Sequence, residues 1–148
     1  MQEISLSVDL LAASRRSETL RNVPEEQMKR DVANYLRFLK LVQIHGGPLA
    51  PTREIDQVWH LHMLHSVAYQ QDCMRLFGRT LDHDGGFGSV PEELPILGKV
   101  FERTARLWKE RFGESYVAGC EDAMEKCWHD CQSRCWHACS SESRAPVE

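Results

Sequence analysis

The sequence predicts an all-α fold, an irregular bundle of about five or six short helices that ends in a cysteine-rich C-terminal helix. Apolar residues recur at i+3 and i+4 spacing along most of the chain, and no segment alternates with the period of two that a strand requires. Glycine or proline separates the helical stretches. The 148 residues fit a single domain, and the 42% hydrophobic content excludes a mainly disordered protein.

The first two helices are predicted over residues 5–18 and 24–45. Ser7 is a candidate N-cap for the first, a short amphipathic segment. The second begins at Pro24 and carries two glutamates in its first turn, where they favour the positive end of the helix dipole. A Gly-Gly-Pro sequence ends it. Its apolar stripe comprises Met28, Val32, Tyr35, Leu36, Leu39 and Val42.

Two further helices follow Thr52 and are separated by a break near His65 and Ser66. Thr52 is a candidate N-cap for the first of them. Ser66 is a candidate cap for the second, which should end at Gly78. Because of this break, two short helices are expected here in place of one long helix.

A loop is predicted over residues 79–90, because this stretch contains several glycines and polar turn formers. The next helix should start at Pro91, followed by two glutamates, and end at Gly113. A last helix is expected over about residues 117–139. These elements complete the predicted bundle.

The composition argues against several classes of partner. With 18 Lys and Arg against 22 Asp and Glu, the net charge is -4, which disfavours nucleic-acid binding. No apolar run approaches the roughly 18 residues that a membrane span needs. The N-terminal segment has no basic stretch before its apolar residues, so no secretory signal is expected, and a cytoplasmic location is predicted.

A candidate metal site comes from residues near the middle of the chain. Asp56 and His60 are four residues apart, so they share one face of a helix. His83 follows in the glycine-rich loop. Two imidazoles and one carboxylate suit Zn²⁺, or a non-haem Fe²⁺ with open positions. Cys73 is a softer alternative ligand.

His62 is a further candidate ligand, but it cannot join His60 on a continuous helix, because the two side chains lie about 200° apart. If the chain bends after it, His62 could face Asp72 or His83. A structural interpretation stays open for the whole cluster: His60 could simply form a bond with Asp56 in the core.

A distinctive string, PTREIDQVWHLHML, runs from Pro51 to Leu64, and it is followed by Tyr69, Asp72-Cys73, Phe77-Gly78 and His83-Asp84. With these residues the chain resembles the glycine-rich domain-containing protein-like family, which includes plant and small bacterial proteins and is classed as a domain of unknown function. The resemblance spans about residues 28–86, and it implies no particular reaction. Many members have a proline in place of Ser66, which implies a helix break there. The glycine-rich tail of the plant members has no counterpart in this sequence.

Cysteines are concentrated at the C-terminal end. An eight-residue pattern occurs twice, as KCWHDCQS over residues 126–133 and RCWHACSS over residues 134–141. On a helix, cysteines four residues apart differ by only about 40°, so the thiols share one face. This uneven distribution predicts a helical domain over residues 1–114 and a cysteine-rich tail over residues 115–148. The five cysteines of the tail are Cys120, Cys127, Cys131, Cys135 and Cys139.

The row of thiols predicts binding of a soft metal ion. Cysteines at i and i+4 can hold Cu(I), whereas a tetrahedral zinc site needs ligands from a second element. A protein partner could also bind through this tail. The alternatives are a core-facing stripe of small apolar side chains, and cysteines that are cross-linked or modified.

Three functions fit these observations. The first is a metal-handling protein that binds zinc, copper or iron through the thiol-rich tail and the Trp-His-x-His segment. The second is an iron- or zinc-dependent enzyme that uses Asp56, His60 and His83. The third is a non-catalytic interaction module, or a substrate whose Cys-Trp-His tail a partner enzyme modifies.

Overall fold

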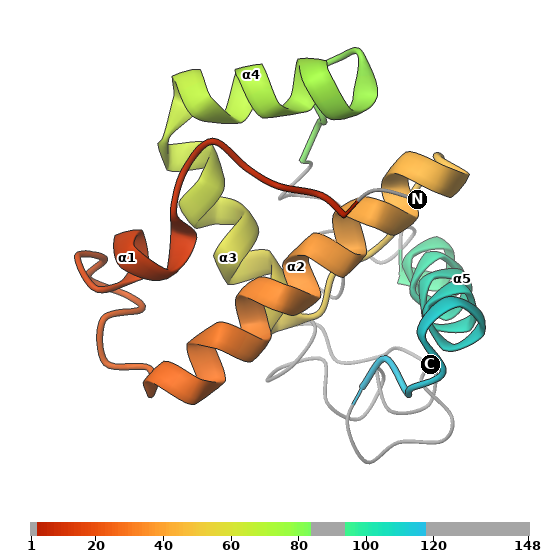
Figure 1. The fold of residues 1–148 in the computed structure, drawn as a ribbon. Coiled ribbons are helices and arrows are strands. Elements are labelled where there is room, and N and C mark those ends of the chain that lie inside the picture. Colours follow the sequence, from red (N-terminus) through yellow and green to blue (C-terminus); the bar gives the residue numbers. More distant parts are fainter. Residues whose placement is uncertain (1–2, 84–93, 118–148) are drawn as a thin grey trace. The chain divides into compact units, whose positions relative to one another are not determined.

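A computed structural model describes residues 3–83 and 94–117, and within these ranges the chain forms α-helices and no strands (Figure 1). The predicted all-α class is therefore confirmed. The helices of the described residues are α1 (Leu10–Ser14), α2 (Glu25–His45), α3 (Arg53–Leu64), α4 (Ser66–Phe77) and α5 (Leu94–Phe112).

The chain divides into two compact units. The first unit comprises Met1–Ile44 and Ile55–Asp82, and it contains α1, nearly all of α2, most of α3, and α4. The second unit comprises His45–Glu54 and His83–Glu148, and its described helix is α5. Each unit has its own buried apolar side chains.

Helix α2 provides much of the core of the first unit. It starts directly after Pro24 and ends at His45, where Gly46 and Gly47 adopt positive φ angles of 62° and 71°. Such angles favour glycine, which explains why the helix ends there. The buried stripe differs from the predicted one, because Phe38 and Leu41 are fully buried, whereas Val32 and Leu36 are only half-buried.

Helix α1 is shorter than predicted. The sequence indicates residues 5–18, but only Leu10–Ser14 are α-helical, and the N-cap is Asp9, whose Oδ1 accepts the N–H of Ala12 at 3.1 Å. The proposed cap, Ser7, donates both its backbone N–H and its hydroxyl to the buried Asp72. Ser7 is thus bound to a carboxylate distant in sequence, and Asp9 caps the helix in its place.

The predicted break between α3 and α4 is confirmed, and the two helices meet at a sharp bend (Figure 1). His65 lies outside the helical region at φ -92° and ψ 73°, and it is the N-cap of α4. The cap therefore lies one residue before the predicted Ser66. Gly78 ends α4 with a φ of 75°, as the sequence indicates.

In the second unit, α5 packs with the segment that precedes α3. Thr104 of α5 accepts the backbone N–H of Ala50 at 2.9 Å, and the hydroxyl of Tyr116 donates to the carbonyl of Ala50 at 2.7 Å. The ring of Tyr116 also lies 5.3 Å from that of Phe101 and 4.8 Å from that of Trp108. Residues beyond α5 therefore belong to the core of this unit.

Several predictions fall outside the described residues: the helix start at Pro91, most of the 79–90 loop, and the C-terminal helix with its five cysteines. The division between residues 114 and 115 also stays a prediction. Within residues 3–83 and 94–117, no helix combines the length and apolarity that crossing a membrane requires.

Candidate metal centre

Helix α3 places Asp56 and His60 on the same face, one turn apart. Oδ2 of Asp56 lies 3.7 Å from Nε2 of His60. The Asp56 side chain is completely buried, whereas the His60 side chain is 39% exposed. The pair thus joins a carboxylate that is shielded from water to an imidazole that water can reach.

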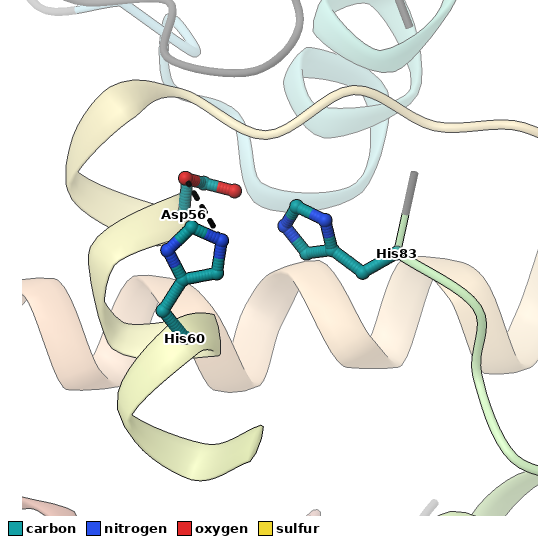
Figure 2. A group of neighbouring side chains, drawn as sticks. All are labelled: Asp56, His60 and His83. Atoms are coloured by element: carbon teal, nitrogen blue, oxygen red, sulfur yellow. Dashed lines mark ion pairs between the residues drawn. The ribbon is translucent and has the colours of Figure 1, made fainter. Parts of the chain in front are cut away.

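His83 brings a second imidazole to this pair. One ligand atom from each of Asp56, His60 and His83 lies within 4.8 Å of the others, and the three side chains converge (Figure 2). His83 directly follows Asp82 in the segment after α4. Two residues of one helix and one residue about twenty positions later therefore form the group.

The group has the donor types of a metal site. Metal–ligand bonds of 2.0–2.1 Å separate the donor atoms of a tetrahedral site by about 3.3 Å. The three ligand atoms here lie within 4.8 Å of one another, so the side chains would have to approach one another to bind one ion at these distances. With three protein ligands, at least one coordination position stays open for water or another molecule.

The structure places His62 elsewhere. His62 is 1% exposed, and its two ring nitrogens lie 2.7 Å from the hydroxyl of Tyr35 and 2.9 Å from Oδ2 of Asp72. Burial lowers the pKa of His62, although the bond to Asp72 opposes this shift. A neutral ring fits both contacts, because Nε2–H donates to Asp72 and Nδ1 accepts from Tyr35. Both nitrogens are thus used within the core.

Asp72 anchors this second cluster. Burial alone would raise its pKa, but hydrogen bonds from Ser7, His62 and Arg75 outweigh burial and lower it. The Arg75 guanidinium donates at 2.7 Å and the Ser7 hydroxyl at 2.8 Å. A buried carboxylate with this many donors stabilises the fold by tying the N-terminal segment to α4.

Cys73 is also not brought into the Asp56, His60 and His83 group. It is a buried free thiol with 2% exposure, close to Tyr69. The five candidate ligands of the tail lie outside the described residues. Of the candidate metal ligands that the structure describes, three converge and two lie apart.

Tyr69, which had no predicted role, contacts two segments near the candidate site. Its hydroxyl accepts the indole N–H of Trp59 at 2.9 Å and donates to the carbonyl of Leu81 at 2.8 Å. Tyr69 is among the residues that carry the family resemblance, and this resemblance was the feature of the sequence that pointed to Tyr69. Its partners lie ten and twelve positions away, so local pattern did not predict the contacts.

The chain is similar to two curated proteins of Arabidopsis thaliana. It is 31% identical over 129 residues to "Glycine-rich domain-containing protein 2", covering 75% of this chain and 15% of that protein. It is 33% identical over 94 residues to "Glycine-rich domain-containing protein 1", covering 60% of this chain and 11% of that protein. The chain thus spans only a small part of these relatives. No family model and no solved structure matches it.

Proposed function

The chain belongs to the family of the glycine-rich domain-containing proteins, and within this family we propose that it is a metal-binding protein. The proposed ligands are Asp56, His60 and His83, and the proposed ion is a divalent first-row metal, Zn²⁺ or Fe²⁺. The names of the relatives state no reaction, so the proposal depends on the chemistry of the site.

The observation that carries the proposal is the convergence of three ligand atoms within 4.8 Å. A completely buried carboxylate is costly unless hydrogen bonds or a positive charge compensate it. A divalent ion is one group that would supply such a charge. The i, i+4 spacing on α3 is also the spacing that helices commonly use to present two ligands to one ion.

The open coordination position and the exposure of His60 favour a reactive site over a purely structural one. Structural zinc sites use four protein ligands, whereas catalytic sites use three and keep a position for water or substrate. An ion held here would lower the pKa of a bound water or polarise an oxygen of a bound molecule. This supports the metal-dependent enzyme as the form of the proposal that the described residues favour.

A cobalt titration tests the proposal, because Co²⁺ replaces Zn²⁺ and its spectrum reports the ligand type. The full chain is titrated anaerobically with Co²⁺ and then with Zn²⁺. A site of nitrogen and oxygen ligands gives visible bands without the intense near-ultraviolet sulfur-to-cobalt bands of a thiolate site. We expect one such site in each chain.

Substitution then identifies the ligands. Asp56→Asn and His60→Ala should each reduce the affinity for Co²⁺ by more than about 100-fold, because even partners of the ligands contribute 10–100-fold. His45→Ala is the matched control, since it removes an exposed imidazole outside the group. If Asp56→Asn and His60→Ala bind Co²⁺ as well as the unaltered chain, the proposed site is wrong.

The thiol-rich tail carries a second candidate function, binding of a thiophilic ion such as Cu(I). The repeated Cys-Trp-His-x-Cys pattern supports it. Replacing all five cysteines of the tail by serine should abolish high-affinity Cu(I) binding and leave the nitrogen- and oxygen-ligated Co²⁺ site intact. The replaced residues are Cys120, Cys127, Cys131, Cys135 and Cys139. If the chain bound neither Co²⁺ nor Cu(I), the interaction module or the modified substrate would be the remaining proposed function.

A further inference from the structure

We propose that Tyr69 is a positioning residue of the candidate metal centre, because its hydroxyl connects the helix that carries two of the ligands to the segment that carries the third. This inference rests on the proposed function. Tyr69 touches none of the three ligands in the described contacts, so its effect would act through the segment that ends at His83.

The connection consists of two hydrogen bonds to one oxygen. Trp59, the neighbour of His60 on α3, donates its indole N–H to the Tyr69 hydroxyl at 2.9 Å. The same hydroxyl donates to the carbonyl of Leu81 at 2.8 Å. Leu81 is two residues before His83. The oxygen of Tyr69 therefore lies between residues that are one and two positions from metal ligands.

The groups that make this connection are rigidly held. Trp59, Tyr69 and Leu81 are all less than 9% exposed. The Trp59 ring packs on Phe38 of α2, with the ring centroids 5.4 Å apart. The Tyr69 and His62 rings pack in a T-shaped arrangement, with the ring centroids 4.9 Å apart. Burial also raises the pKa of Tyr69 far above its usual value, so the hydroxyl keeps the proton that it donates.

The segment that carries His83 needs such a contact. α4 ends at Gly78, and residues 80–83 have no regular secondary structure, so no helix or sheet bonds fix their path. The Tyr69 bond holds the Leu81 carbonyl and therefore limits where His83 can lie. Without it, the segment could shift by more than the small tolerance of a metal–ligand bond.

The test is the affinity of the full chain for Zn²⁺ in three forms: unaltered, Tyr69→Phe and Tyr35→Phe. Both variants lose one buried phenol hydroxyl, but the Tyr35 hydroxyl bonds to His62 and not to the segment that carries His83. We expect Tyr69→Phe to weaken Zn²⁺ binding by at least about tenfold, which is typical of partners that orient ligands. Tyr35→Phe should bind Zn²⁺ as the unaltered chain does.

A double substitution tests whether Tyr69 acts through His83. If it does, Tyr69→Phe should have no further effect on Zn²⁺ affinity in a chain that already carries His83→Ala. The inference is wrong if the effect persists in that background, if both phenylalanine variants lose affinity equally, or if Tyr69→Phe binds normally. A chain that binds no Zn²⁺ in its unaltered form overturns the proposed function, and this inference with it.

A second variant decides the matter if Tyr69→Phe does not fold. Trp59→Phe keeps an aromatic ring at this position, although a smaller one, and removes the indole N–H from the connection. We expect it to fold and to weaken Zn²⁺ binding less than tenfold but measurably, with a change in the visible spectrum of the Co²⁺ form. Unchanged affinity and an unchanged spectrum in Trp59→Phe would contradict the inference.

Discussion

At the scale of single residues, the buried pair of His62 and Asp72 makes the stability of the chain depend on pH. The folded state lowers the pKa of His62 below its usual 6.5, so the unfolded chain binds more protons as the pH falls below that value. Stability that is fully present above pH 6.5 is therefore lost progressively in acid. The lowered pKa of Asp72 adds a second loss as the pH falls below 3.8.

Urea unfolding at a series of pH values, with a chelator present, measures this dependence. His62→Gln keeps a neutral polar side chain at this position. Below pH 6.5, we expect it to reduce the slope of the free energy of unfolding plotted against pH. The reduction should be at most about 1.4 kcal/mol per pH unit, the contribution of one proton. An identical slope in His62→Gln would show that other groups cause the acid destabilisation.

The candidate site shows which residue contacts the sequence could predict. Asp56 and His60 were predictable because helical periodicity alone places residues four apart on one face. The position of His83 was proposed only from its residue type, since no periodicity governs a loop. Ser7 and Asp72 are 65 positions apart, and their bond replaced the expected helix cap. Contacts of this kind depend on the tertiary fold, which local pattern does not encode.

At the scale of secondary structure, the bend between α3 and α4 should accept proline. Ser66 is exposed and is the first residue of α4. The backbone N–H of a first helical residue makes no hydrogen bond within the helix, so a proline there removes no helical hydrogen bond. His65 already lies outside the α region, as a residue before proline prefers. We expect Ser66→Pro to leave the free energy of unfolding unchanged or raise it by up to about 1 kcal/mol.

The control for this prediction is Gln70→Pro, an exposed position inside the same helix. There proline removes an internal hydrogen bond and clashes with the preceding turn, which costs about 3 kcal/mol or more. Thermal unfolding followed by circular dichroism compares the two variants. Equal destabilisation by both substitutions would mean that the bend is not a true helix boundary.

At the scale of the whole chain, glycine and proline positions predicted the order of the elements well. The ends of α2, α4 and α5 all coincide with glycines at positive φ, namely Gly46, Gly78 and Gly113. The division into two compact units was not predicted, because the first unit is interrupted by residues 45–54, which belong with α5. The sequence pattern does not indicate that residues 45–54 pack with a helix about fifty positions later.

The second unit leads to a prediction about where the chain can be shortened. Tyr116 and Val117 are 7% and 1% exposed, and the Tyr116 hydroxyl bonds to Ala50 within the same unit. A chain that ends at Glu114 loses these contacts, whereas a chain that ends at Val117 keeps them. We expect the shorter chain to be less stable by at least about 3 kcal/mol, the cost of removing one large buried side chain.

Chemical unfolding of the two truncated chains, followed by tryptophan fluorescence, measures this difference, because Trp108 packs against Tyr116. Tyr116→Ala in the longer chain removes the side chain but keeps the backbone, and it should reproduce most of the loss of stability.

Co²⁺ binding by the chain that ends at Val117 should match that of the nitrogen- and oxygen-ligated site in the full chain, since Asp56, His60 and His83 are all retained. If both truncated chains unfold at the same denaturant concentration, the core of the second unit ends before residue 115.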